Sequence, residues 1–317
     1  MLKIAIVGTG LIGIRHVEAI KKLPDCELVA LCDINEEKVK ALAEENGVPY
    51  FLDYKEIPDK VECDAVILNL PHGIHCESSV FFLDHGIHVL VEKPMANTVE
   101  ECETMIAAAK RNGKKLAIAH IQRFFTANVM VKNIIESGEL GKLCMYNEQR
   151  TINYFVDSRP RWMLNKKMAG GGIVMNYGAH ALDKMYYVTG ARPVSIDANC
   201  ANFKNGESIE GHAQIFAKFD NGVTASITFS GYTNTLYESI YYFTNGALRV
   251  RGSDILDINK DDGNGWVNVP AINDHLELVR EIDEFCKYVN GEPSVIPDAE
   301  YGRDVIAAIE KAYTFLN

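Results

Sequence analysis

The chain has 317 residues, of which 47% are hydrophobic and 24% are charged, and this composition indicates a globular protein with two domains. Its formal net charge of -11 argues against a surface that neutralises nucleic-acid phosphates or an anionic membrane, so we expect neither partner. No apolar run approaches the roughly 20 residues that cross a bilayer, and no basic leader precedes the first apolar run. These features predict a cytoplasmic protein that acts on a small molecule.

Residues 1 to 119 alternate strand-like and helix-like segments, a pattern typical of a parallel sheet covered by helices on both faces. The candidate strands are residues 3–7, 27–32, 48–52, 65–70, 88–91 and 115–119. Gly47 marks the end of one helix, and Thr98 with Glu101 predicts a capping box at the start of another. We therefore predict a Rossmann domain with a doubly wound parallel sheet over residues 1–119.

After a helix that ends near Gly138, period-two alternation dominates, for example over residues 194–200 and 223–229. The turn sequences at residues 220–222 and at Asn245-Gly246 indicate hairpins. Helical spacing returns over residues 276–285 and 305–312. We predict a second α/β domain over residues 120–317 with a largely antiparallel sheet, whose C-terminal helix packs back on the first domain. The eight cysteines lack CxxC pairs, so we interpret them as reduced structural thiols.

A GxGxxG motif stands directly between the first strand and the first helix, the position in which it binds a dinucleotide. It consists of Gly8, Thr9, Gly10, Leu11, Ile12 and Gly13. In this motif the first glycine permits a tight turn, the second lets the backbone approach the pyrophosphate, and the third allows close helix packing. The alternative is a glycine-rich turn that binds no ligand.

Asp33 follows the second strand, twenty residues after Gly13, where a carboxylate binds the adenosine ribose hydroxyls. A carboxylate there would also repel a 2′-phosphate, and no Arg or Lys lies between Asp33 and Glu37 to receive one. We therefore predict NAD as the cofactor in preference to NADP. In the competing interpretation, Asp33 only caps the helix that follows.

Two later segments carry side chains suited to proton transfer. Lys93, in the sequence Glu92-Lys93-Pro94, stands at the carboxyl end of a strand and can donate to a substrate hydroxyl, although a solvated lysine is the alternative. Asn176, His180 and Asp183 share one face of a helix that follows three glycines. A histidine there can accept a hydroxyl proton while hydride leaves the same carbon, although a lone helical histidine can also be structural.

In this order, the motifs resemble the Gfo/Idh/MocA oxidoreductase family along essentially the whole chain. The resemblance rests on the GxGxxG start, Pro71, His75, residues 92–95, residues 122–124 and the triple-glycine helix. It implies a Rossmann domain followed by an α/β domain with an open-faced sheet, through which homodimers or homotetramers form. It also implies Lys93 and His180 as the catalytic pair, and we place Pro71, His75, Glu92 and Lys93 at the cofactor site.

We therefore expect an NAD-dependent dehydrogenase that moves hydride between the nicotinamide and a secondary hydroxyl of a sugar, sugar derivative or cyclitol. The predicted substrate-site residues are Asn176, Asp183, Arg123 and Trp162. Inositol and related sugar dehydrogenases of the family often have Asp where this chain has Asn176, and an amide cannot act as an anionic base.

Three alternatives differ in chemistry. The first is a lyase or glycosidase that retains NAD and oxidises its substrate only transiently, and the second is a dinucleotide-sensing regulator without catalysis. The third is a metal site, because His72, His75 and Cys76 lie close together in the sequence. No second group of ligands accompanies them, so we predict no metal.

Overall fold

The computed structural model describes residues 1–204, 206, 208–260, 262–270 and 274–315. The chain forms two compact units: Met1–His120 with Leu276–Asp304, and Ile121–His275 with Val305–Asn317. Residues 276–304 thus belong to the first unit, whereas the sequence division places them in the second domain. Each unit is described by itself below.

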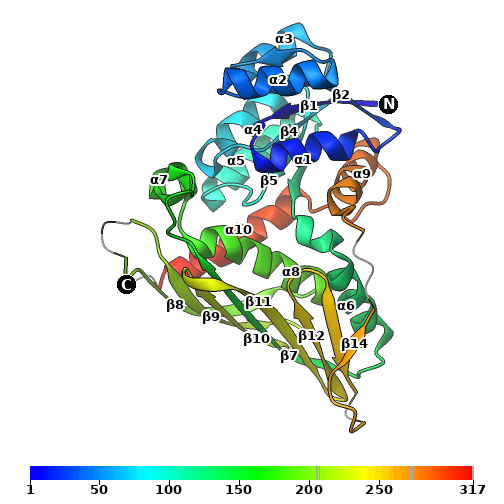
Figure 1. The fold of residues 1–317 in the computed structure, drawn as a ribbon, viewed down its shortest axis with the longest axis vertical. Coiled ribbons are helices and arrows are strands. Elements are labelled where there is room, and N and C mark those ends of the chain that lie inside the picture. Colours follow the sequence, from blue (N-terminus) through cyan, green and yellow to red (C-terminus); the bar gives the residue numbers. More distant parts are fainter. Residues whose placement is uncertain (205, 207, 261, 271–273, 316–317) are drawn as a thin grey trace. The chain divides into compact units, whose positions relative to one another are not determined.

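The first unit contains a six-stranded parallel sheet in the order β3-β2-β1-β4-β5-β6 (Figure 1). Its strands are β1 (Leu2–Val7), β2 (Cys26–Cys32), β3 (Tyr50–Phe51), β4 (Ala65–Leu68), β5 (His88–Glu92) and β6 (Leu116–Ala119). All four residues of β4 are fully buried, as expected for a central strand covered on both faces. The predicted Rossmann fold is confirmed.

Helices cover both faces of this sheet (Figure 1). They are α1 (Leu11–Ile20), α2 (Glu36–Asn46), α3 (Ile57–Lys60), α4 (His75–Asp84), α5 (Val99–Asn112) and α9 (Glu277–Asn290), with the short η1 (Tyr54–Glu56) and η2 (His72–Ile74). The helix signals are confirmed: Gly47 adopts the left-handed conformation after α2, and Thr98 Oγ1 accepts from the N–H of Glu101 at 3.1 Å. Local capping therefore sets these helix boundaries.

The late segment joins the first unit through backbone and side-chain contacts. The N–H of Ile118 in β6 donates to the carbonyl of Pro297 at 2.9 Å, and Arg15 on α1 pairs with Glu277 on α9 at 2.6 Å. Gly302 packs directly against β6, since a Cβ there would lie 2.7 Å from a side-chain carbon of Ile118. These contacts explain why residues 276–304 do not group with the second unit.

The second unit contains an eight-stranded sheet in the order β14-β13-β12-β11-β7-β10-β9-β8. Its strands are β7 (Leu143–Asn153), β8 (Pro193–Ala201), β9 (His212–Phe219), β10 (Thr224–Ser230), β11 (Tyr232–Phe243), β12 (Gly246–Arg251), β13 (Ile255–Asn259) and β14 (Val267–Val269). All neighbours are antiparallel except β7 and β10, so the predicted largely antiparallel sheet is confirmed. Both predicted hairpins are present, between β9 and β10 and between β11 and β12.

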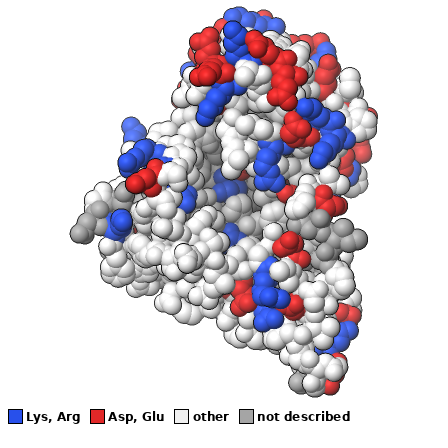
Figure 2. Space-filling model, viewed as in Figure 1, with Lys and Arg blue, Asp and Glu red and all other residues white. Residues whose placement is uncertain are grey.

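One face of the large sheet is open. Along β9, Ala213, Ile215 and Ala217 are buried, while Gln214, Phe216 and Lys218 alternate with them on the exposed face. In Figure 2 the surface over β8 to β11 carries few charged groups, whereas side chains of both signs gather over α2 and α3. This alternation confirms the open-faced arrangement.

Helices lie against the buried face of the sheet (Figure 1). The second unit contains α6 (Thr126–Ser137), α7 (Lys166–Ala169), α8 (Ala179–Thr189) and most of α10 (Ala299–Tyr313), with η3 (Ile121–Phe124), η4 (Arg161–Leu164) and η5 (Val174–Gly178). No helix in the described part of the chain has both the length and the apolar character needed to span a bilayer.

Candidate functional site

The glycine-rich loop links β1 to α1 at the carboxyl edge of the parallel sheet. Gly8 has a φ of 91°, and a Cβ at this position would lie 2.3 Å from the carbonyl oxygen of Asn69. A Cβ on Gly13 would lie 2.0 Å from the carbonyl oxygen of Gly8. The fold itself therefore requires both glycines. Gly10 differs, because its φ is -70° and no protein atom lies within 4 Å of its missing Cβ.

Asp33 stands directly after β2 and contacts this loop. Its Oδ2 accepts from the N–H of Thr9 at 2.7 Å and from Thr9 Oγ1 at 3.1 Å, while its Oδ1 accepts from the N–H of Asn35 at 2.9 Å. The N-cap of α2 is Asn35, whose Oδ1 accepts from Lys38. The alternative in which Asp33 only caps this helix is therefore wrong.

Pro71 and His75 follow β4, beside the segment that follows β5. His75 is fully buried, with Nδ1 2.9 Å from the carbonyl of Pro94 and Nε2 2.8 Å from the carbonyl of Leu70. Burial lowers the pKa of His75. Both ring nitrogens face backbone carbonyl oxygens, so His75 lies between the two loops and presents no nitrogen to a cofactor. The same contacts leave no nitrogen for the metal site considered with His72 and Cys76.

Glu92 ends β5, and Lys93 follows it with a cis peptide bond to Pro94. Both residues are half-buried, and the N–H of Lys93 donates to Glu92 Oε2 at 3.1 Å. Together with residues 8–13, Asp33 and Pro71, they stand at the carboxyl ends of β1, β2, β4 and β5. Open α/β sheets bind their ligands at this edge.

In the second unit, the segment after the triple glycine begins with a π-helical turn, η5, and continues as α8. The sequence predicts an ordinary helix here, and turns of this wider kind are frequent at functional sites. His180 is half-buried, whereas Asn176 is buried and donates from Nδ2 to the hydroxyl of Tyr154 at 3.4 Å. Burial raises the pKa of Tyr154 to about 12, so this phenol is neutral near pH 7.

Two predicted substrate-site residues contact each other. Arg123 Nε donates to Asp183 Oδ1 at 2.8 Å, and Asp183 has no exposed surface. This buried ion pair holds η3 against α8 and leaves Asp183 inaccessible to a substrate. Trp162 lies in η4 and is half-buried.

The sequence analysis did not predict a buried ionic cluster between α8 and the large sheet. Lys184 Nζ lies 2.6 Å from Glu148 on β7, 2.7 Å from the hydroxyl of Tyr237 and 2.6 Å from Ser239 Oγ. Arg150 is buried as well, 3.4 Å from Glu148, with its guanidinium 3.9 Å from the centre of the Tyr237 ring. The residues of this cluster come from α8, β7 and β11, so no spacing in the sequence indicates that they meet. The contacts fix α8, and with it His180, against the sheet.

Glu210 holds the triple-glycine segment in place. Its carboxylate accepts from the N–H groups of Gly172 at 2.8 Å and Val174 at 2.9 Å, and from the hydroxyl of Tyr313 at 2.8 Å. These bonds satisfy amides at the start of η5, a region where helices leave N–H groups without internal partners. Glu210 therefore fixes the point from which Asn176 and His180 project.

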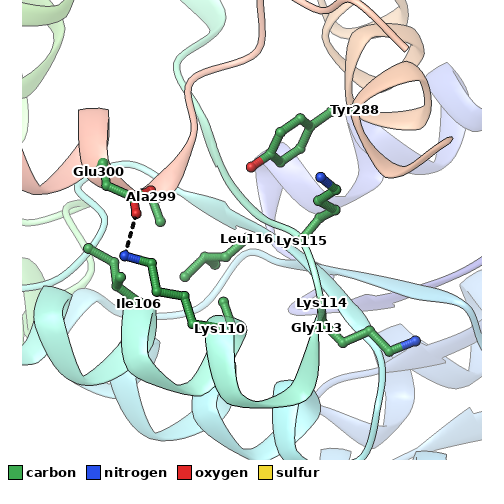
Figure 3. A pocket seen from close by; sticks show the side chains of 10 residues that line it. Ile106, Lys110, Gly113, Lys114, Lys115, Leu116, Tyr288, Ala299 and Glu300 are labelled. Atoms are coloured by element: carbon green, nitrogen blue, oxygen red, sulfur yellow. Dashed lines mark ion pairs between the residues drawn. The ribbon is translucent and has the colours of Figure 1, made fainter. Parts of the chain in front are cut away.

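A separate pocket of about 310 Å³ opens in the first unit (Figure 3). Lys110 pairs with Glu300 at 2.8 Å, and Lys115 Nζ lies 4.8 Å from the centre of the Tyr288 ring. Leu116 also lines the pocket and is the first residue of β6, so the pocket stands at the amino end of that strand. The candidate cofactor residues stand at the carboxyl ends of the strands, so this pocket is not the cofactor site.

A parallel Rossmann sheet with a glycine-rich loop, joined in one chain to a large open-faced sheet, defines a dinucleotide-binding oxidoreductase. Residues 2–120 match the family model described as "Oxidoreductase family, NAD-binding Rossmann fold", and residues 129–254 match the GFO/IDH/MocA C-terminal domain. The chain belongs to the Gfo/Idh/MocA oxidoreductase family.

Known proteins are similar to all or part of this chain. A 1-carboxy-3-chloro-3,4-dihydroxycyclohexa-1,5-diene dehydrogenase from Comamonas testosteroni is 28% identical, over 68% of this chain and 48% of that protein. D-Glucoside 3-dehydrogenase from Escherichia coli is 28% identical, over 97% of this chain and 94% of the relative. The crystal structure of an aldose-aldose oxidoreductase from Caulobacter crescentus, complexed with glycerol, has a TM-score of 0.90 and 24% identity, covering 99% of this chain and 97% of that one. The similarity to this solved structure shows a shared fold.

Proposed function

We propose that the protein is an NAD-dependent dehydrogenase that oxidises a secondary hydroxyl of a sugar, sugar derivative or cyclitol. The observation that carries the proposal is the carboxyl edge of the parallel sheet, where the open backbone at Gly10, the carboxylate of Asp33 and the lysine Lys93 follow the ends of β1, β2 and β5. The relatives that act on glucosides and other hydroxylated rings support this substrate class.

NAD is the proposed cofactor in preference to NADP. Residues 8–13 fit the pyrophosphate, because amides at the start of α1 and the uncovered backbone at Gly10 suit an anion. The Asp33 carboxylate would bind the adenosine ribose hydroxyls and repel a 2′-phosphate. When bound, NAD supplies the hydride acceptor.

Lys93 and His180 are the proposed catalytic residues. Lys93 would donate a hydrogen bond to the reacting hydroxyl and His180 would accept its proton, while hydride leaves the same carbon and a carbonyl forms. Asn176 orients the substrate as an uncharged donor, and the buried Arg123–Asp183 pair positions α8. Trp162 would contribute an apolar wall.

The test is nicotinamide absorbance with NAD or NADP and a panel of cyclitols, aldoses, sugar acids and amino sugars. We expect NADH to accumulate with one substrate group. Lys93→Met and His180→Asn should each lower turnover at least about 100-fold with NADH binding retained. Lys114→Met, at the opposite end of the sheet, is the matched control. Near-normal turnover in Lys93→Met, or no reaction across the panel with NAD binding intact, would overturn the proposal.

We also propose a homodimer or homotetramer that forms through the open face of the large sheet. Phe216 and Val194, on the exposed side of β9 and of β8, are 57% and 62% exposed. Apolar side chains gathered on one face often mark an interface.

A further inference from the structure

Two cysteine thiols of the first unit contact each other and have no part in the proposed chemistry. Cys26 begins β2 and Cys286 lies on α9, 260 positions further along the chain, yet their sulfur atoms are 3.0 Å apart. Both residues belong to the first unit, and each is 8% exposed. The Cys63 thiol, by contrast, lies 2.9 Å from the backbone carbonyl oxygen of Ala65. Each sulfur of the pair therefore faces an atom with which it can form a covalent bond.

Regular secondary structure holds the two sulfur atoms in place from opposite sides. Cys26 pairs with Leu2 of β1 in the parallel sheet. On α9, Ile282 and Phe285 have no exposed surface, so the turn that carries Cys286 is anchored in the core. A disulfide has an S–S bond of about 2.05 Å, so the two sulfur atoms need to approach by about 1 Å. Small adjustments of the two side-chain dihedral angles can supply this movement.

The two thiols differ in how readily they ionise. The hydrogen bond with Cys286 lowers the pKa of Cys26, aided by the charge of the N-terminus, although burial acts in the opposite direction. The same hydrogen bond raises the pKa of Cys286, as do burial and the charge of Asp283. The thiolate is the nucleophile in thiol oxidation, so Cys26 is the thiol that reacts first and Cys286 is its neighbour.

We propose that Cys26 and Cys286 form an oxidation site, at which hydrogen peroxide converts the two thiols into a disulfide that stabilises the folded chain. The Cys26 sulfur attacks hydrogen peroxide and breaks its O–O bond, which gives a sulfenic acid and one water molecule. The Cys286 sulfur then attacks the Cys26 sulfur, the S–O bond breaks, and a second water molecule leaves. Two electrons pass from the sulfur atoms to the peroxide, and the two thiol protons leave in the water.

The disulfide ties α9 covalently to the parallel sheet. Residues 121–275 lie between the two cysteines in the chain, so the bond closes a loop that contains most of the second unit. A cross-link over so long a loop restricts the unfolded chain and thereby stabilises the folded one. Cys26 is the first residue of β2, whereas Asp33 follows the other end of that strand. The oxidation site is therefore distinct from the proposed cofactor site and does not depend on the proposed dehydrogenase function.

The test treats the full chain with a small excess of hydrogen peroxide, blocks the remaining thiols with iodoacetamide and maps the peptides by mass spectrometry. We expect the peptides that contain Cys26 and Cys286 to be joined, with a loss of about 2 Da for the two hydrogen atoms, and to separate after reduction with dithiothreitol. The oxidised chain should melt at least about 5 °C above the reduced chain. The joined peptides should form at least about tenfold faster in the folded chain than in guanidinium, because folding brings the thiols together.

Cys286→Ser removes the second thiol of the pair. It should prevent the link and the rise in melting temperature, and it should leave Cys26 as a sulfenic acid that dimedone labels. Cys286→Ala serves if the Ser variant fails to fold. Cys63→Ser is the matched control, because it removes a half-buried thiol of the same unit that faces a backbone carbonyl, and it should form the link as the wild type does.

Three results would overturn the proposal. One is the absence of the link under conditions that oxidise the exposed Cys144. The second is a link that forms equally fast in the folded and the unfolded chain, because the contact in the fold would then have no role. The third is a linked chain whose melting temperature does not rise, because the disulfide would then not stabilise the fold. None of these measurements uses a substrate or turnover.

Discussion

The backbone N–H of Thr9 donates to the Asp33 carboxylate at 2.7 Å, so the residue predicted to select the cofactor also holds the loop that receives it. Asp33 Oδ2 takes a second bond from the Thr9 hydroxyl, which fixes the turn after β1 against the end of β2. Loop geometry and the proposed ribose recognition therefore depend on one side chain.

Replacing Asp33 with Ser should weaken NADH binding and reduce the preference for NADH over NADPH. Loss of charge-assisted hydrogen bonds costs about 1.5–3 kcal/mol, which corresponds to roughly 10- to 100-fold in affinity. Fluorescence titration with each reduced cofactor measures both dissociation constants. Asp53→Ser is the control, because the Asp53 side chain caps η1 by accepting from the N–H of Lys55. An unchanged ratio of the two constants would rule out the ribose role.

Substitutions at Gly10 and Gly13 should distinguish a glycine that cofactor binding needs from one that the fold needs. Gly10→Ala should keep the melting temperature, because the methyl group meets no protein atom, yet weaken NADH binding about tenfold or more by obstructing the pyrophosphate. Gly13→Ala places Cβ 2.0 Å from a carbonyl oxygen and should cost about 1–3 kcal/mol of stability. Thermal melts and cofactor titration check both variants. If Gly10→Ala bound NADH normally, the pyrophosphate would not lie against this backbone.

Glu92→Gln should stabilise the protein at pH 8 and leave its stability at pH 5 nearly unchanged. The folded-state pKa of Glu92, about 7, lies above its ordinary value of 4.5. Its stabilising contribution is therefore complete below about pH 4.5 and is lost as the pH rises through 7. Glutamine remains neutral, so we expect a gain on the order of 3 °C at pH 8. Glu44→Gln, exposed on α2, is the control in scanning fluorimetry, and equal shifts at both pH values would contradict the assignment.

Lys184→Met should destabilise the second unit by about 3 kcal/mol, because it leaves the buried Glu148 carboxylate with the Tyr146 hydroxyl and with Arg150 as a more distant cation. Adding Glu148→Gln should recover part of the loss. Lys132→Met breaks a partly exposed pair with Glu136 on α6 and should change stability by less than about 0.5 kcal/mol. Chemical denaturation compares the three proteins. An equal loss of stability in Lys184→Met and Lys132→Met would show that burial does not strengthen the contribution of the Lys184–Glu148 pair.

Phe216→Glu should dissociate the proposed oligomer, because it places a charge on the open face of the large sheet. Light scattering after size-exclusion chromatography reports the molar mass. Leu52→Glu alters a side chain of the first unit that is 42% exposed, and it should leave the mass unchanged. A monomeric wild type, or an unaltered mass for Phe216→Glu, would place the interface elsewhere or exclude one.

Local signals in the sequence were sufficient to predict the parallel sheet and its glycine-rich loop, but not the residues 276–304 that complete the first unit. Gly8 and Gly13 act through neighbours that the βαβ topology brings together, so their structural roles could be predicted from the motif, whereas the bonds from Thr9 to Asp33 could not. His75 shows the limit of this reasoning, because the sequence places it at the cofactor edge, but only the fold shows that both of its nitrogens face backbone carbonyl oxygens.

Contacts between distant segments were beyond prediction. Arg123 and Asp183 have the chemistry of substrate ligands, and nothing in their spacing indicates that they neutralise each other in the interior. Glu281 lies 265 positions after His16 in the chain, so only the packing of α9 on α1 reveals their approach. The π-helical turn of η5 likewise has no periodicity that distinguishes it from an α-helix.

Because residues 276–304 belong to the first unit, they limit how the two units can be exchanged between related proteins. A fragment that ends at His120 would lack α9, and with it the partners of Arg15 and His16. Recombination between relatives would therefore have to exchange residues 121–275 together with residues 305–317, and to keep residues 1–120 and 276–304 from one parent. Chimeras joined at a single crossover near residue 120 would inherit α1 and α9 from different parents, and would require those two helices to match.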